Sequence, residues 1–153
     1  MRDTLKMSYS IFQQQVLDFH NVLRAKHSAE PLVLDPQICQ YAQQWANTLA
    51  SKKVLQHRTN GKYGENLYAL YGKTNVDASQ VVNAWYNEVK YYTFGTSQPH
   101  NFSQVGHFTA LVWKKSRKLG VGIAAKGTNV YVVCNYDPPG NVMGHYHHNV
   151  TGK

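Results

Sequence analysis

Four side chains of this 153-residue sequence have the chemistry that a functional site requires: His57, Glu65, Glu88 and His107. Carboxylates and imidazoles transfer protons near neutral pH, and imidazoles also ligate divalent cations. Glu65 follows Gly64, whose backbone can turn sharply. Glu88 lies three residues after Trp85, so it shares part of one face of an expected helix. From the residues alone, each carboxylate is either a rim residue or a buried functional acid, and general burial tendencies favour the rim.

No short motif joins the two histidines to each other. The HExxH spacing of zinc enzymes is absent from the sequence, as are the nucleophile elbow, the phosphate-binding loop and the dinucleotide fingerprint. His20 and Arg24 lie one turn apart on the first expected helix, where a hydrogen-bonded packing role is the simpler interpretation. Three histidines near the C-terminus predict only incidental metal binding; they are His145, His147 and His148.

Three helices are expected from the hydrophobic periodicity. The first covers residues 9–28, where one apolar face recurs at three- and four-residue steps through Phe12, Val16, Phe19 and Leu23. The second covers residues 36–53, with Asp35 as its N-cap and Pro36 in its first turn. The third begins after Asn75 or Asp77. His57 falls in the loop that follows the second helix.

Strands are expected at residues 65–71, 119–125 and 130–136, with a turn at 126–129 between the last two. Residues 108–113 are apolar, and periodicity alone leaves them as helix or strand. Helices followed by strands and a late hairpin indicate an α+β fold, in which helices pack on an antiparallel sheet. We expect one domain over residues 9–142, with flexible tails at 1–8 and 143–153.

The charge of the sequence favours an anionic partner. Sixteen basic and eight acidic residues give a net charge of +8, which predicts contact with anionic membrane lipids. The basic residues gather at Lys52 and Lys53, at Arg58 and Lys62, and over residues 114–118; solvated helix ends are the simpler alternative for these clusters. Nucleic acid is not expected as a partner, because no recognition motif accompanies the clusters.

The cysteine content and the N-terminal residues predict an intracellular protein. Only Cys39 and Cys134 are present, so a disulfide framework is not expected, and the sequence leaves open whether these two form a bridge. The first residues contain no apolar signal-peptide region. Two glycosylation triplets, at Asn101 and Asn149, favour the alternative of an extracellular protein, and the sequence leaves their use open.

Four local strings together resemble the motifs of the CAP superfamily, the cysteine-rich secretory, antigen 5 and pathogenesis-related proteins. Residues 20–24 (HNVLR) are similar to the HNxxR motif, and residues 64–67 (GENL) match a second motif. Residues 106–113 (GHFTALVW) resemble the first family signature, and residues 131–142 (YVVCNYDPPGNV) resemble the second. The chain is most similar to the Golgi-associated plant-pathogenesis-related group, although Arg2 replaces the glycine that myristoylation needs.

The resemblance implies a three-layer α-β-α sandwich and one cleft that joins His57, Glu65, Glu88 and His107. It implies that His57 and His107 bind Zn²⁺ or another divalent cation, with the two glutamates beside them. It also implies a non-catalytic module that binds sterol or phospholipid, with lipid contacts at Tyr136, Asp137, Pro138 and Pro139. A protease or glycosidase using Glu65 and Glu88 is one alternative. A self-associating scaffold, with a homodimer as its expected form, or an immune-related secreted protein is the other. The cytosol or the cytosolic face of the Golgi is the location that the resemblance implies.

Overall fold

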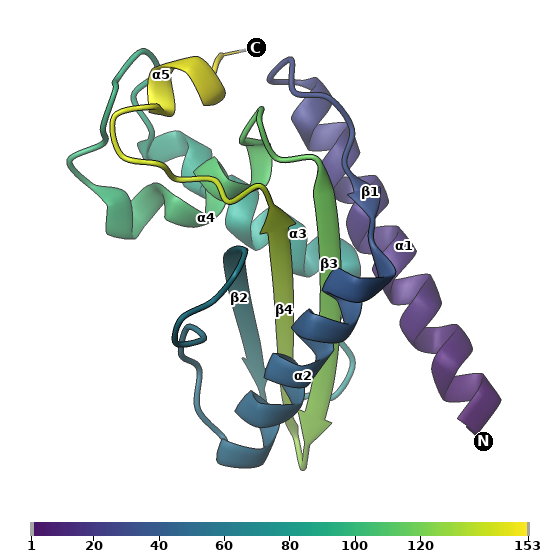
Figure 1. The fold of residues 1–153 in the computed structure, drawn as a ribbon. Helices are drawn as coiled ribbons and strands as arrows, with labels where there is room; N and C mark the ends of the chain where they lie inside the picture. The colour runs from purple at the N-terminus through teal and green to yellow at the C-terminus, as the bar shows by residue number, and fades with distance from the viewer. Residues whose placement is uncertain (1, 153) are drawn as a thin grey trace.

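The computed structural model describes residues 2–152, and side chains from residue 8 onward, as helices around one sheet (Figure 1). The elements are α1 (Arg2–Ala25), β1 (Val33–Leu34), α2 (Pro36–Lys52), β2 (Gly64–Tyr71), α3 (Ala78–Tyr86), the 3₁₀ helix η1 (Asn87–Tyr91), α4 (Phe102–Val112), β3 (Lys118–Lys126), β4 (Asn129–Asp137) and α5 (Tyr146–Asn149). The strand order is β1-β3-β4-β2. The three long strands are antiparallel, as expected, whereas the two-residue β1 runs parallel to β3.

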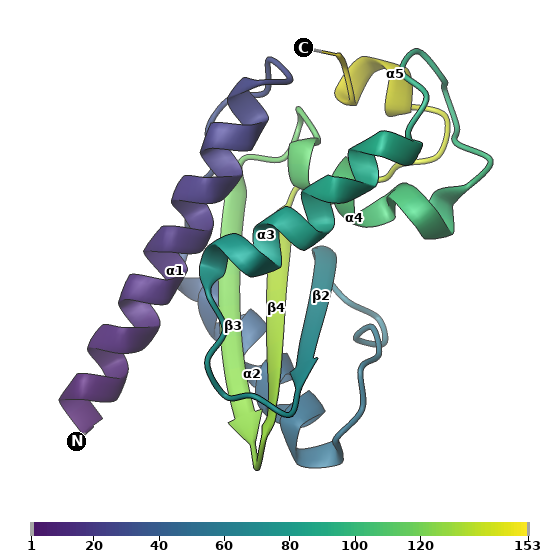
Figure 2. The same ribbon diagram turned by 180° about the vertical axis from the view of Figure 1, so that it is seen from behind.

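The helices cover both faces of the sheet, which confirms the three-layer α-β-α sandwich. Helix α2 covers one face, and α1, α3 and α4 cover the other (Figures 1 and 2). Strand β4 is buried on both faces because its side chains alternate: Tyr131 and Val133 pack toward α2, and Val132 and Cys134 pack into the larger core of α1, α3 and α4. Cys134 and Cys39 are free thiols.

Helix α2 lies close against β3 because two strand residues have no side chain. A Cβ atom built on Gly120 would overlap the backbone carbon of Ile38, and one on Gly122 would lie 2.6 Å from that of Ala42. The helix begins as expected: the Asp35 carboxylate accepts the Ile38 N–H at 3.0 Å, and proline follows the cap. These contacts fix the helix that leads into the loop of His57.

The expected tail at 143–153 is wrong for the residues that the structure describes. Tyr146 and Val150 are buried, and the Tyr146 ring meets Trp113 edge-on at 5.0 Å. The expected tail at 1–8 is helical backbone from Arg2 onward. Met1 and Lys153 lie outside the described residues. The C-terminal segment is folded because its Tyr and Val side chains complete a core built by other elements.

Two further expectations about helices are corrected by packing. Residues 108–113, for which periodicity allows helix or strand, belong largely to α4, which begins at Phe102; the Gly, Ser, Pro and Asn content of residues 94–104 instead predicts a loop there. Phe19, expected on the buried face of α1, is exposed.

Among the described residues, no helix has the length and apolar character needed to cross a bilayer.

Candidate functional site

Glu88 holds His107 through two hydrogen bonds and the neighbouring Phe108 through a third. Helix α4 carries the histidine, and the Glu88 carboxylate approaches it from η1, which follows α3 directly. Its Oε1 accepts the backbone N–H groups of His107 at 2.9 Å and Phe108 at 3.0 Å, and its Oε2 lies 2.8 Å from His107 Nδ1. The Trp85 ring stacks on the imidazole, with 6.2 Å between centroids and 8° between planes. The orientation of the imidazole is therefore fixed on several sides.

A second pair, His57 and Glu65, repeats this arrangement across the cleft. Glu65, in β2, places Oε1 2.7 Å from His57 Nδ1 and accepts the Arg58 N–H at 3.1 Å. The loop is held against α2 by Arg58, whose guanidinium covers the Tyr41 ring at 3.8 Å and donates to the Tyr41 carbonyl at 3.0 Å. The Glu65 side chain is largely buried, whereas His57 is exposed at the rim.

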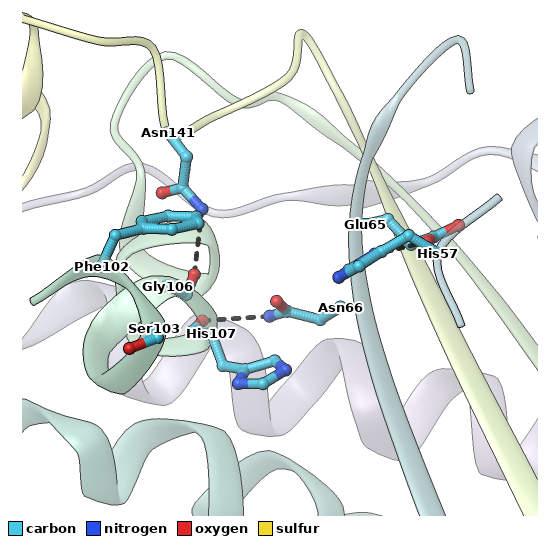
Figure 3. Close-up of a pocket in the computed structure, with 8 residues that line it drawn as sticks. All are labelled: His57, Glu65, Asn66, Phe102, Ser103, Gly106, His107 and Asn141. Carbon is cyan, nitrogen blue, oxygen red and sulfur yellow. Dashed lines mark hydrogen bonds and ion pairs between the residues drawn. The ribbon is translucent and has the colours of Figure 1, made fainter. Parts of the chain in front are cut away.

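Both histidines direct Nε2 toward the space between them. An ionised carboxylate only accepts hydrogen bonds, so each Nδ1 carries the proton, and when the ring is neutral its lone pair is on Nε2. His57 and His107 lie on opposite sides of a cleft of about 160 Å³, each with a ring nitrogen directed inward (Figure 3). The other lining residues are Glu65, Asn66, Phe102, Ser103, Gly106 and Asn141. Glu88 supports His107 from behind and does not line the cleft.

Asn66 is a cleft residue that the sequence reasoning missed. Its amide nitrogen donates to the His107 carbonyl at 3.0 Å and to the Tyr136 hydroxyl at 3.2 Å. Because a carbonyl only accepts, the nitrogen must face it, and the amide oxygen is left for the cleft. Figure 3 shows Asn66 between the two histidines. The GENL string contains this residue, but only the fold shows which way its amide points.

The family model for the cysteine-rich secretory protein family matches residues 17–136, which include all four residues of the two pairs. The chain belongs to the CAP family. Over 146 residues it is 42% identical to human Golgi-associated plant pathogenesis-related protein 1, covering 91% of this chain and 92% of that protein. It is 40% identical to pathogenesis-related protein 1C of Nicotiana tabacum, over 86% of this chain and 78% of that one.

A longer secreted relative and a solved structure are also similar to this chain. Secreted protein RBT4 of Candida albicans is 41% identical over 87% of this chain, which spans only 36% of that protein. The solved structure of NaASP2 with Zn²⁺ has a TM-score of 0.72 and 26% identity, covering 92% of this chain and 84% of that one. CAP proteins similar to this chain thus include both secreted and Golgi-associated members.

The cleft of this CAP domain brings together two histidine side chains that could act as ligands. Among the side chains that the structure describes, residues 8–152, no group of three or more His, Cys, Asp or Glu is placed to hold a metal ion. The donor set still suits a borderline-soft cation, because neutral imidazoles with Nδ1 bonded to carboxylates are the usual form of histidine ligands.

His20 and Arg24 lie outside the cleft. They are buried and hydrogen-bonded, which confirms their packing role.

The hydrogen bond that His57 donates to Glu65 raises the pKa of His57 above its ordinary value of 6.5, against the opposing effect of burial. Glu65→Gln is expected to lower that pKa, because the amide keeps an acceptor but loses the charge. The His57–Glu65 ion pair stabilises the fold fully at a pH below the pKa that His57 has in the unfolded chain. This stabilisation is lost as the pH rises through the raised pKa of His57 in the folded protein. NMR titration of the His57 ring measures the change, with His145 as the internal control. An unchanged His57 pKa in the variant would contradict the pairing.

The four residues expected to contact lipid differ in how far the structure exposes them to solvent. Tyr136 is fully buried, with its hydroxyl 2.7 Å from His20 Nε2, so direct contact with lipid is wrong for this residue. Asp137 is half-buried at the end of β4. Pro138 and Pro139 are exposed and line a separate pocket of about 280 Å³. The remaining residues of that pocket are Trp113, Lys115, Val142, His145 and Asn149.

Proposed function

We propose that this CAP domain is a non-catalytic module that binds a divalent cation of the zinc class in the cleft and anionic phospholipid or sterol at membranes. The observation that carries the cation proposal is the use of the ring nitrogens. Each histidine commits Nδ1 to a carboxylate, at 2.7 Å and 2.8 Å, and leaves Nε2 for the cleft. His57 and His107 would hold the cation through these Nε2 atoms, with the remaining positions open to water.

Further support for zinc comes from ligand chemistry and from one relative. Imidazole suits Zn²⁺, whereas Mg²⁺ and Ca²⁺ prefer oxygen ligands. The crystal structure of the relative NaASP2 was solved with Zn²⁺. Glu65 and Glu88 act from behind the histidines: they fix the tautomer and orient the rings, and such carboxylate partners typically contribute about 10–100-fold in metal affinity.

The same geometry disfavours the alternative of an acid/base hydrolase. A general acid must reach the substrate, but Glu88 does not line the cleft, and its two oxygens already accept three N–H groups of the protein. Glu65 is bonded to His57 and to the Arg58 N–H. A screen of peptide and glycan substrates tests this point. Turnover by the wild type that Glu65→Gln abolishes would overturn the non-catalytic assignment.

Calorimetric titration near neutral pH tests the cation proposal. We expect one saturable site for Zn²⁺ and no saturable heat for Mg²⁺ under the same conditions. The affinity for Zn²⁺ should fall as the solution is acidified through the raised pKa of His57, because protonation of Nε2 competes with the cation. Absence of a saturable Zn²⁺ site up to millimolar concentration, or equal binding of Mg²⁺, would overturn the proposal.

The lipid part of the proposal is supported by charge and by the second pocket. The net charge of +8 favours an anionic surface. The pocket beside Pro138 and Pro139 combines apolar walls with Lys115, which suits a lipid with an acidic head group. Ionic strength separates the two lipid classes: salt weakens binding to anionic phospholipid by screening, whereas binding of an uncharged sterol is insensitive to it.

A further inference from the structure

An apolar tip projects from the segment between β4 and α5. Met143 is 78% exposed and Val142 is 46% exposed. Phe102, also exposed, lines the cleft together with Asn141, the residue that precedes this tip. Large apolar side chains that cluster on a surface in this way mark a site of interaction with a protein or a membrane.

The tip is anchored at both ends. On one side, the Asn141 amide donates to the Gly106 carbonyl at 3.0 Å and accepts the Thr109 hydroxyl at 2.6 Å. On the other side, the Gly144 N–H donates to the Gln98 side chain at 2.9 Å, and Tyr146 is buried in the core. Val142 and Met143 are therefore presented to solvent by a fixed backbone, so little ordering entropy opposes their burial by a partner.

Basic side chains flank the tip. Lys115 and Val142 line the same pocket. The backbone N–H groups of Lys114 and Lys115 donate to Asn149, at 3.1 Å to its carbonyl and 3.2 Å to its side chain, which ties the lysine pair to α5. Lys115 therefore lies beside the exposed Val142 at this pocket, and Lys114 precedes it in the same turn.

The chain segment that builds this part of the molecule is almost free of acidic residues. Residues 102–117 and 138–152, which build this surface, contain no acidic residue. The Lys and Arg side chains of these residues are Lys114, Lys115 and Arg117. A partner at this surface must therefore accept both positive charge and exposed apolar side chains.

We propose that Phe102, Lys114, Lys115, Val142 and Met143 form a docking surface for a membrane leaflet rich in anionic phospholipid. This inference rests on the lipid binding proposed above and assigns it to one face. Val142 and Met143 enter the boundary between head groups and acyl chains, and the two lysines contact lipid phosphates. Nucleic acid fits less well, because it offers no apolar phase for Val142 and Met143.

Cosedimentation with phospholipid vesicles tests the docking surface. The wild type should bind vesicles that contain phosphatidylserine and not vesicles of phosphatidylcholine alone, at about 0.1 M salt. Lys114→Gln/Lys115→Gln should weaken binding about thirtyfold, from the usual contribution of a lysine near an anionic leaflet. Val142→Asp/Met143→Asp should weaken it at least about tenfold, because each aspartate removes an apolar contact and adds repulsion.

Matched controls place the same substitutions elsewhere. Val22 and Val33 are 60% and 65% exposed on α1 and β1, so Val22→Asp/Val33→Asp should bind as the wild type does. Lys52→Gln/Lys53→Gln at the end of α2 should change binding less than about threefold, because it removes the same charge from a place outside the docking surface. Thermal melts check that each variant is folded.

Three outcomes would overturn the inference, and they are distinguishable from one another. If the wild type binds anionic vesicles and the docking-surface variants bind equally well, the surface is wrong while the proposed lipid function stands. If the wild type binds no vesicle, the lipid function fails as well. If duplex DNA is bound with a loss on Lys114→Gln/Lys115→Gln and none on Val142→Asp/Met143→Asp, the partner is nucleic acid.

Discussion

A His57→Ala/His107→Ala double variant is expected to lose the saturable Zn²⁺ site. Each imidazole contributes the Nε2 atom that its carboxylate-bonded Nδ1 leaves free. Loss of a supporting carboxylate alone typically costs about 10–100-fold in metal affinity, so removal of both ligands should weaken binding by more than about 100-fold. Calorimetry with ZnCl₂ measures the change. The fold should persist, because His57 is exposed and His107 is only partly buried.

Histidines outside the cleft supply the control for this result. His145 and His148 are exposed near α5, so a His145→Ala/His148→Ala variant removes the same number of imidazoles and leaves the cleft intact. We expect it to bind Zn²⁺ with the affinity of the wild type. Equal Zn²⁺ binding by the wild type and the cleft double variant would rule out the cleft as the cation site.

Arg24→Met is expected to lower the free energy of unfolding by about 4 kcal/mol, which is typical when a buried polar network loses one partner. The buried guanidinium donates to four carbonyls, those of Glu30, Leu111, Trp113 and Ser116, at 2.8–3.1 Å. Methionine fills much of the space but leaves these acceptors without their donor. Because two of the carbonyls lie at the end of α4, the helix of His107 should also lose its anchor to α1. Urea denaturation measures the loss.

Arg117 offers the same substitution at an exposed position. Its guanidinium donates to the Lys114 and Ser116 carbonyls, in the same turn that Arg24 approaches from inside. Arg117→Met should cost less than about 1 kcal/mol, because solvent replaces these bonds. A loss in Arg24→Met no greater than in Arg117→Met would contradict the role assigned to the buried guanidinium.

The parts of the fold that local patterns determine were predictable from the sequence. Asp35 and Pro36 marked the start of α2, and the turn at 126–129 marked the β3–β4 hairpin, as the structure confirms. The C-terminal segment was mispredicted because its eleven residues carry no periodicity. Tyr146 and Val150 are buried only because residues of other elements, Trp113 among them, form the core against which they pack. Such tertiary burial leaves no local signal.

The candidate site divides in the same way. Residue type and motif resemblance singled out His57, Glu65, Glu88 and His107, but not how they pair. Glu65 pairs with His57, eight residues before it, and Glu88 pairs with His107, nineteen residues after it. Only the packing of η1 against α4 and of the loop against β2 brings each pair together. The orientation of the Asn66 amide likewise depends on the His107 carbonyl, which no sequence pattern reveals.

The central claim is that both cleft histidines keep the proton on Nδ1 and offer Nε2 to a cation. Long-range ¹H–¹⁵N NMR of the histidine rings tests it most directly, at a pH above the raised pKa of His57. We expect His57 and His107 to be in the Nδ1–H tautomer in the metal-free protein. Added Zn²⁺ should then shift the Nε2 resonances of both rings and leave both Nδ1 protons in place. An Nε2–H tautomer at either residue, or Zn²⁺ shifts confined to the C-terminal histidines, would contradict the account.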